Sequence, residues 1–233
     1  MLYHQKEGLR WLIFEIFEPF QNLSHAVFLK EEKPLFPQEK ENIMKTATPH
    51  DSLSSLHLVH GNMVIEAPVP ALNIQADGMI TQTLDAALTM SHADCQIAIF
   101  YDPIHHALGM AHAGWRGQVC GIYEKVIQKM QKMYGSLPQD LHVGISPSLG
   151  PCCAEFLHYQ EEFPETFREF MVRPYYFDLW EIARWQLISH GILPSHLQVA
   201  KICTCCNPSH YFSYRRDHTS QRNRVKAVLT KTA

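Results

Sequence analysis

The residues best suited to chemistry lie between Ser91 and Gly117, in the stretch SHADCQIAIFYDPIHHALGMAHAGWRG. Two apolar runs within it, at residues 96–101 and 107–111, predict a pair of strands. Cys95 precedes the first run and His112 directly follows the second. If the strands pair antiparallel, the thiol and the imidazole meet at the same end of the sheet. A cysteine and a histidine in one place are half of a zinc-type ligand set.

The turns around this strand pair also favour a binding site. Asp102-Pro103 between the two runs is typical of a turn. Gly114 and Gly117 let the backbone approach a ligand closely, and Arg116 between them suits a bidentate grip on phosphate. The alternative is a structural ion pair between this guanidinium and a nearby carboxylate. Val119 is expected to begin a helix, whose N-terminus could attract an anion.

The elements that position these residues can be read from periodicity. Apolar residues recur every three or four positions from Val119 to Gly135, which predicts an amphipathic helix that ends at the glycine. Asp178 and Glu181 form a capping-box pattern before a second helix that ends at Gly191. Alternation over residues 141–146 predicts a strand with one buried face. Further strands are expected at residues 9–17, 26–29, 56–65, 76–80 and 197–202, and a further short element at residues 84–90. Residues 30–45 are expected to form a loop or lid.

Composition bounds the class of protein. The chain has 233 residues, of which 46% are hydrophobic and 18% charged, and these values exclude disordered and fibrous classes. A net charge of −3 argues against nucleic acid or an anionic membrane as a partner. There is no apolar run long enough to span a membrane, and we predict a cytoplasmic protein. Without repeats or low-complexity tracts, residues 1–233 are expected to form a single α+β domain.

Several motifs together resemble one known family. HADC, HAGWRG, Val59-His60-Gly61, Gly150-Pro151-Cys152, Cys203-Thr204 and the run FSYRRD at residues 212–217 are similar to the YfiH-type proteins. These proteins were once described as laccase-like polyphenol oxidases and are now regarded as zinc-dependent purine nucleoside phosphorylases that also deaminate adenosine. The matches fall in order from about residue 57 to 225, while residues 1–50 are divergent. The resemblance implies two mixed β-sheets between helices, an α/β/β/α sandwich.

The resemblance also implies a metal site. The family's ligands fall on His60, Cys95 and His112, which would hold zinc with one open position, and copper is a possible alternative. The sequence separations of 35 and 17 residues form no local motif by themselves. A histidine beside glycine is often a turn residue, and a strand-end cysteine is often a core residue. A metal at such a site lowers the pKa of a coordinated water, which suits deamination at C6 of adenosine.

Catalytic and substrate-binding roles follow for a few charged or nucleophilic residues. Cys95, Arg116 and Asp94 are the candidate catalytic residues, and Arg116, Arg215 and Arg216 are the candidate substrate-binding residues. For Asp94 the alternative is a hydrogen-bonded carboxylate that holds the loop. For Arg215 and Arg216, expected just after a short strand at residues 212–214, the alternative is an ion-paired edge.

The function implied by the resemblance is phosphorolysis of adenosine, inosine and methylthioadenosine, with adenosine deamination. Three alternatives remain open: an editing hydrolase of peptidoglycan precursors, a copper-dependent polyphenol oxidase, and a degenerate binding protein. The oxidase is disfavoured because the chain lacks the His-x-His pairs of multicopper laccases. The binding protein is considered because the family's N-terminal Thr-x-Arg-x-Gly-Gly-Val-Ser segment has no counterpart here.

The remaining cysteines offer a second candidate site. Seven cysteines, an odd number, indicate reduced thiols in a chain of this size. Cys203, Cys205 and Cys206 contain a Cys-x-x-Cys pattern, with His210 close behind, so a second zinc site or a redox pair must be considered. We favour structural thiols, because no second Cys-x-x-Cys supplies the missing ligands. Cys152-Cys153 is likewise expected to serve packing.

Overall fold

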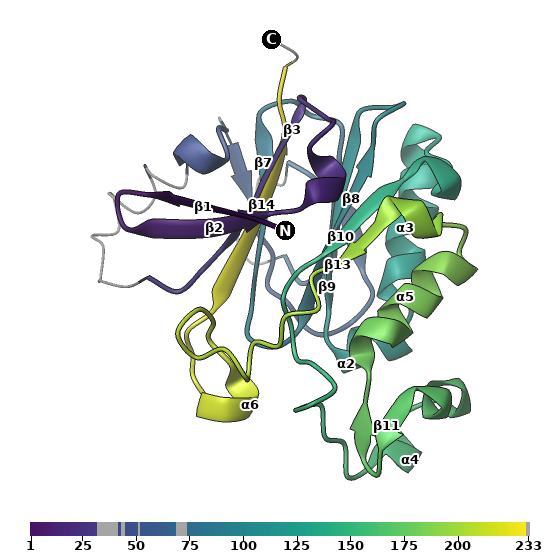
Figure 1. Ribbon diagram of the computed structural model, residues 1–233. Helices are drawn as coiled ribbons and strands as arrows, with labels where there is room; N and C mark the ends of the chain where they lie inside the picture. The colour runs from purple at the N-terminus through teal and green to yellow at the C-terminus, as the bar shows by residue number, and fades with distance from the viewer. Residues whose placement is uncertain (32–41, 43–44, 51, 69–73, 232–233) are drawn as a thin grey trace.

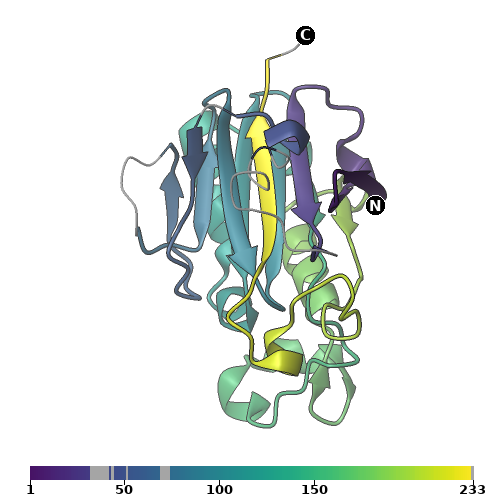
Figure 2. The ribbon, with the colours of Figure 1, turned by 90° about the vertical axis from the view of Figure 1, so that its left-hand side faces the viewer.

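Two mixed sheets pack face to face in the computed structural model, which describes residues 1–31, 42, 45–50, 52–68 and 74–231 (Figure 1). In the described residues each of these sheets has six strands. The first has the order β1(Leu2–Lys6), β2(Leu9–Ile13), β3(Leu23–Phe28), β14(Asn223–Leu229), β7(Ala86–His92) and β4(Ser52–Ser54). The second has the order β13(Leu197–Val199), β10(His142–Ile145), β8(Gln96–Asp102), β9(Ala107–Ala113), β6(Gly78–Thr81) and β5(Val64–Glu66). Figure 2 views the stack from the side of the first sheet, with β14 near its centre.

Strand β8 shows why the central apolar run has no polar face. Ile97, Ile99 and Tyr101 pack into the core between the two sheets. Ala98 and Phe100 point the other way, into the core between the second sheet and the helices. Because side chains alternate along a strand, a strand buried on both faces must be apolar at successive positions. The expected antiparallel pairing with β9 is confirmed, and Asp102 caps the turn by accepting from the N–H groups of Ile104 and His105.

Helices cover the outer face of the second sheet. α3(Ile122–Tyr134) and α5(Leu179–Ser189) lie side by side on it (Figure 1). On the outer face of the first sheet, Leu9, Ala26 and Phe28 form a small cluster with Ala47, which lies in a helical turn at residues 45–47. The α+β class and the sandwich of two mixed sheets between helices are therefore confirmed.

The remaining elements connect or extend these layers. They are η1(Glu15–Phe17), α2(Trp115–Val119), η2(Pro138–Asp140), α4(Tyr159–Glu162), η3(Glu165–Phe170), β11(Met171–Arg173), β12(Tyr176–Phe177), η4(Pro194–His196) and α6(Tyr214–Asp217). α2, α4, β11 and α6 gather at one end of the sheets, the lower end in Figure 1. None of the helices described combines the length and the apolar content that crossing a bilayer would need.

The expected start of the first long helix was wrong. Val119 ends the short helix α2, and Gly121 separates it from α3 with a left-handed φ of 74°. The apolar pattern did not reveal this break, because Val119 fits the pattern but is exposed, and the residues that α2 buries are Gly117 and Gln118. The predicted end at Gly135 is confirmed, and its φ of 77° explains the glycine.

Burial on both faces also overturns the expectation for residues 141–146. In β10, Val143, Gly144 and Ile145 are all buried, so the strand has no exposed face. Gly144 faces the first sheet, where a Cβ would lie 2.8 Å from the ring of Phe14 and 2.9 Å from that of Phe17. The alternation in the sequence thus reflects large and small residues on two buried faces.

Other boundaries differ for local reasons. The expected strand at residues 9–17 divides into β2 and the turn η1, and the expected strand at 197–202 ends at Val199. Residues 58–63 form a loop before β5 instead of a strand. The expected strand at 212–214 is wrong, because Ser213 caps the helix α6. Asp178 caps α5 through the N–H groups of Trp180 and Glu181, as predicted. The loop or lid expected at residues 30–45 lies largely outside the described residues.

A buried histidine on β3 gives a testable acid sensitivity. His25 is 6% exposed, and its Nε2 accepts from the N–H of Phe14 at 2.7 Å. Burial, with a smaller contribution from the charge of His4, lowers the pKa of His25 to about 3. The unfolded state therefore binds this proton first, and stability falls as the pH drops below about 6.5. Between pH 7 and pH 5, protonation of this group alone is expected to lower the free energy of unfolding by about 2 kcal/mol.

His25→Gln should reduce that loss, since glutamine offers an acceptor to Phe14 without titrating. Urea unfolding at pH 7 and pH 5 measures the difference in the free energy of unfolding. The exposed His158, changed to Gln, is the matched control and should leave the difference unchanged. If wild type and His25→Gln lose the same stability on acidification, His25 is not the sensitive group.

Candidate metal centre and cavity

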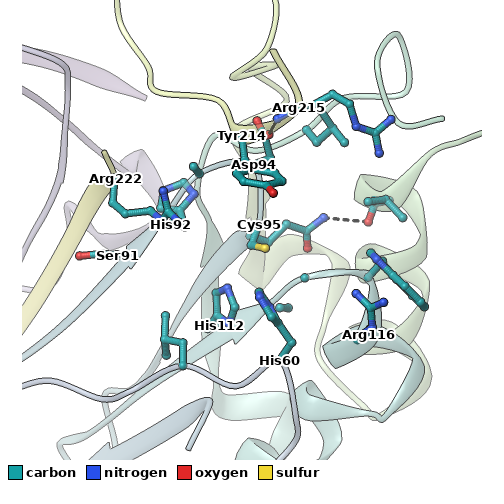
Figure 3. A pocket seen from close by; sticks show the side chains of 18 of the residues that line it. His60, Ser91, His92, Asp94, Cys95, His112, Arg116, Tyr214, Arg215 and Arg222 are labelled. Carbon is teal, nitrogen blue, oxygen red and sulfur yellow. Dashed lines mark hydrogen bonds between the residues drawn. The ribbon is translucent and has the colours of Figure 1, made fainter. Parts of the chain in front are cut away.

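Three metal-capable side chains meet where β8 and β9 end. The strand register pairs Ile97 with His112, which places Cys95 and His112 at the same end of the sheet, as predicted. His60 reaches them from the loop before β5. The ligand atoms of His60, Cys95 and His112 all lie within 4.8 Å of one another, and their side chains point together in Figure 3. The sequence prediction that these residues come together is confirmed.

Asp77 holds two of the three candidate metal ligands in place, His60 and His112. The sequence analysis did not include Asp77 in the site. Its buried carboxylate accepts from His112 Nδ1 at 2.8 Å, from the backbone N–H of His60 at 2.9 Å and from that of Gly61 at 2.7 Å. Nδ1 of His112 is thereby engaged, which leaves Nε2 for a metal. A carboxylate behind a ligating histidine is a common way to fix its ring. The available signal was a carboxylate between Ala76 and Gly78, at the head of a buried strand.

The backbone of His60 needs this support. Its φ of 61° is left-handed, which is uncommon for a residue with a side chain. Two of the hydrogen bonds to Asp77 come from the backbone at this turn. The loop therefore presents the imidazole of His60 in a fixed position opposite Cys95.

The cluster favours a thiolate. Burial raises the pKa of Cys95, but its contacts with His112 and His60 outweigh burial and lower the pKa to about 6. Burial lowers the pKa of His112, whereas the hydrogen bonds to Asp77 and Cys95 raise it, with a net value of about 9. A thiolate is the form of cysteine that binds metals. A cation bound here would replace the proton that the thiolate and the imidazole share.

Gly114 leaves the space that the cluster needs. A Cβ at this position would lie 2.9 Å from Cys95 Sγ and 3.3 Å from His60 Nδ1. Its φ of −72° is open to any residue, so space and not backbone freedom requires glycine here. The groups that approach this glycine closely are the candidate metal ligands Cys95 and His60, and its approach to a bound molecule remains a prediction.

Gly114→Ala is therefore expected to weaken metal binding at this cluster by about ten- to a hundredfold, the range found for changes beside metal ligands. Competition against a chromophoric chelator measures the affinity. Gly117→Ala is the matched control, because a Cβ there meets no atom closer than 3.4 Å. Equal affinities in the two variants would contradict the steric argument.

A cavity of about 460 Å³ opens over the cluster. Its size suits a small organic molecule. The lining includes His60, Cys95 and His112 on one side, and Trp115, Phe156 and Tyr214 supply aromatic surface on others. The lining therefore draws on the loop before β5, the β7–β8 turn, β9, α2, the segment before α4 and α6. Figure 3 shows His60, Cys95, His112 and Tyr214 around the cavity.

Arg116 lines this cavity and is exposed. Its guanidinium carbon lies 4.1 Å from the centroid of the Trp115 ring. Within the described parts of the chain, no carboxylate forms an ion pair with it. Stacking on an aromatic ring fixes the plane of a guanidinium and leaves its N–H edge free for an anion. This arrangement favours the phosphate interpretation over the structural ion pair.

The lining carries more positive than negative charge. Arg116, Arg215 and Arg222 contribute guanidinium groups, and Asp94 contributes a carboxylate. Nη1 of Arg215 donates to the carbonyl oxygens of Cys153 at 3.1 Å and Glu155 at 2.9 Å. Arg222 was not singled out from the sequence. Such a balance of charge attracts an anionic ligand.

Asp94 links two loops. Its carboxylate accepts from Thr204 Oγ1 at 2.6 Å, from Ser213 Oγ at 3.1 Å and from the backbone N–H of Arg215 at 2.6 Å. These three bonds support the alternative in which Asp94 holds the loop. A catalytic role for Asp94 remains a prediction.

The Arg216 side chain contacts other parts of the protein and not the cavity. Its guanidinium pairs with Asp217 at 2.6 Å and donates to the carbonyl oxygens of Thr204, Cys205 and Tyr211. It is not part of the cavity lining, in contrast to Arg215. These contacts support the ion-paired interpretation for Arg216 and the pocket-wall interpretation for Arg215.

His92 is a further residue that sequence reasoning left out of the site. It is 2% exposed, it lines the cavity, and neither ring nitrogen has a hydrogen-bond partner among the described residues. Burial, followed by the charge of His112, lowers its pKa to about 3, so the imidazole is neutral. A buried neutral imidazole offers one hydrogen-bond donor and one acceptor, and leaving both groups without a hydrogen bond is unfavourable.

The fold and the site define a class of protein: an α+β sandwich with a His–Cys–His centre at the floor of a small-molecule cavity. The family model described as multi-copper polyphenol oxidoreductase laccase matches residues 18–230. The chain belongs to this family, and the resemblance to YfiH-type proteins is confirmed.

Two relatives show how far the sequence similarity extends. The chain is 35% identical over 150 residues to the purine nucleoside phosphorylase YlmD of Geobacillus stearothermophilus. The aligned region covers 60% of this chain and 55% of the length of that protein. It is 28% identical over 187 residues to a purine nucleoside phosphorylase of Deinococcus radiodurans, with 77% of this chain and 70% of that protein covered.

Solved structures extend the similarity in fold to nearly the whole chain. The crystal structure of YlmD from Geobacillus stearothermophilus superposes with a TM-score of 0.82 at 24% identity, covering 98% of this chain and 99% of that one. The Bacillus licheniformis hypothetical protein YfiH gives a TM-score of 0.83 at 21% identity, also covering 98% of this chain and 99% of that one. The divergent N-terminal part therefore belongs to the same fold.

Proposed function

We propose that this chain is a zinc-dependent purine nucleoside phosphorylase that acts on adenosine, inosine and methylthioadenosine and also deaminates adenosine. One observation carries the proposal: the His60–Cys95–His112 cluster lies at the floor of a cavity whose wall presents the guanidinium of Arg116. The names of the relatives support an activity of this kind.

The three side chains fit zinc by their chemistry. One thiolate and two imidazoles would supply three of the four ligands that zinc usually takes, and all three side chains line the cavity. The bond from His112 to Asp77 and the clearance at Gly114 both suit a bound ion. Copper accepts the same ligand types and is the alternative metal. When bound, zinc would act as a Lewis acid and would lower the pKa of a coordinated water.

The chain's own residues would bind the two substrates. We assign phosphate binding to Arg116. Its guanidinium group stacks on the Trp115 ring and has no carboxylate partner in the described residues. Arg215 adds positive charge at the same wall. The aromatic surfaces of Phe156 and Tyr214 suit a purine ring, and the unpaired nitrogens of His92 suit its polar edge.

In phosphorolysis, a phosphate oxygen forms a bond to the anomeric carbon of the ribose as the bond from that carbon to the base breaks. Arg116 would hold the phosphate beneath the sugar, so that the attacking oxygen is already oriented. The negative phosphate would also stabilise the positive charge that develops on the sugar ring. Asp94 would act by holding the loop that carries Arg215, through its bond to the backbone of that residue.

The test incubates metal-defined protein with adenosine, inosine and methylthioadenosine, with and without phosphate, and resolves the products. Phosphate-dependent release of free base supports the proposal. Release of an amino acid from a peptidoglycan precursor would instead indicate the editing hydrolase. Oxidation of phenols that follows added copper would indicate the oxidase, and inertness toward every substrate would indicate a binding protein.

A further inference from the structure

Four thiols converge at a second place, away from the cavity floor. The Sγ atoms of Cys152, Cys153, Cys203 and Cys206 all lie within 4.8 Å of one another. Cys206 Sγ is 3.4 Å from the Sγ of Cys152 and 3.4 Å from that of Cys153. The sequence has one Cys-x-x-Cys, at Cys203 to Cys206, and the fold brings the adjacent pair Cys152-Cys153 to it. The adjacent pair Cys152-Cys153 completes the set.

We propose that these four cysteines bind a structural zinc ion. Zinc–sulfur bonds of about 2.3 Å in a tetrahedron place the sulfur atoms about 3.8 Å apart. The observed separations, from 3.4 Å to at most 4.8 Å, bracket that value. Four thiolates fill all four positions, so this site has no place for a substrate. It differs in this way from the three-ligand cluster in the cavity, and it goes beyond the proposed function.

The backbone brings the two segments together without any metal. The N–H of Ser148 donates to Ile202 O at 3.1 Å, and the N–H of Thr204 donates to Ser148 O at 3.0 Å. A tight turn, in which Cys153 N donates to Gly150 O at 2.9 Å, then directs the first pair of thiols toward the second. The ligands are thus preorganised, which reduces the entropy that binding a metal must overcome.

The surroundings suit the charge of such a site. Four thiolates and one zinc ion carry a net charge of −2, and guanidinium groups gather at the same two segments. Arg173 donates to Cys152 O at 3.1 Å, Arg215 to Cys153 O at 3.1 Å and Arg216 to Cys205 O at 2.8 Å. These hydrogen bonds go to backbone carbonyl oxygens, so they hold the two segments in place and bring positive charge near the cluster.

One backbone N–H also reaches a sulfur atom of the cluster. The N–H of Gly150 donates to Cys203 Sγ at 3.3 Å. Backbone N–H groups directed at ligating sulfur favour the charged form of the ligand.

Disulfide bonding explains the geometry less well. A disulfide needs two sulfur atoms about 2.05 Å apart, in a defined pair. Here Cys206 is equally close to two different thiols, and all four converge on one point instead of forming two pairs. A tetrahedral ion accounts for convergence of all four at once.

The site would stabilise a wall of the cavity. The Cys153 segment accepts from Arg215, and the Cys203–Cys206 segment carries Thr204, which donates to Asp94. Binding of zinc would therefore fix the two loops that position Arg215. It supplies no chemistry of its own.

The test counts zinc per chain in protein purified under reducing conditions with zinc. Wild type is expected to carry two, and Cys95→Ser, which disables the cavity cluster, is expected to keep one. Replacing that remaining zinc with cobalt should give the intense near-ultraviolet absorption of cobalt–thiolate bonds and the visible bands of tetrahedral cobalt. In the Cys95→Ser background, Cys206→Ser should lose the metal, and Cys205→Ser, one residue away, should retain it.

Two outcomes would overturn the proposal. One is metal-free Cys95→Ser protein, a measurement that does not depend on the folding of any Cys206 variant. The other is a disulfide among the four cysteines, detected by mass spectrometry of the unreduced protein purified without added reductant. Nucleoside turnover is measured separately, so failure of the activity proposal leaves the metal count interpretable.

Discussion

Cys95→Ala is expected to remove the metal held with His60 and His112 and to lower nucleoside turnover by about a hundredfold or more. Residues that merely support a metal ligand already change affinity or activity by about ten- to a hundredfold, so a ligand itself should matter at least as much. The thiolate is also the anionic member of the set, favoured by a pKa lowered to about 6 despite the burial that raises it. His112→Ala should have a similar effect, since it removes the contact with Asp77 as well as a ligand.

The measurement pairs the zinc content of each variant with its turnover of inosine in the presence of phosphate. Wild type and Cys95→Ala should differ by one zinc per chain. Cys120→Ala is the matched control, because Cys120 is exposed and belongs to neither cluster. A Cys95→Ala protein that keeps the same zinc content as wild type, and the same turnover, would place the centre elsewhere.

The central strand pair could be predicted because its signals are local. An apolar run, a turn at Asp102-Pro103 and a second run fix the pairing, and pairing alone brings Cys95 to His112. His60 could not be placed in this way. It lies in a loop whose position depends on hydrogen bonds to Asp77, a residue 17 positions away, and only the family resemblance pointed to it.

The features that the sequence did not show depend on packing between distant segments. In the sequence, Asp77 and His92 are ordinary polar residues. In the fold both are buried: Asp77 is hydrogen-bonded to His112, and the ring nitrogens of His92 have no hydrogen-bond partner among the described residues. The four-cysteine cluster joins residues 152–153 to residues 203–206 through a backbone bridge between Ser148 and Cys203. No spacing rule within one segment could have revealed that contact.

The helix boundary at Gly121 has a different cause. Periodicity reports which residues are buried, but it does not report backbone conformation. A glycine in the left-handed region separates α2 from α3, and Val119, which fits the apolar spacing, lies exposed at the end of α2. The break gives Arg116 a short helix of its own, and this residue lines the cavity.

Arg116→Lys is expected to lower phosphate-dependent turnover by about ten- to a hundredfold while leaving deamination nearly unchanged. The lysine keeps the charge but loses the bidentate fork and the stacking on Trp115, which lies 4.1 Å away. One charge-assisted contact with an anion contributes about 1.5 to 3 kcal/mol, which corresponds to that range of rates. Deamination uses water and no phosphate, so the ratio of the two rates is the informative quantity.

Stability separates a phosphate-binding Arg116 from a structural one. The side chain is exposed and has no carboxylate partner among the described residues, so Arg116→Lys should melt close to the wild-type temperature. Arg184→Lys, a change at an exposed arginine on α5, controls for the substitution itself. An equal fall in phosphorolysis and deamination, together with a lower melting temperature, would show that Arg116 supports the turn after β9. Phosphate would then have to bind elsewhere in the cavity, with Arg215 and Arg222 as the remaining guanidinium groups of its lining.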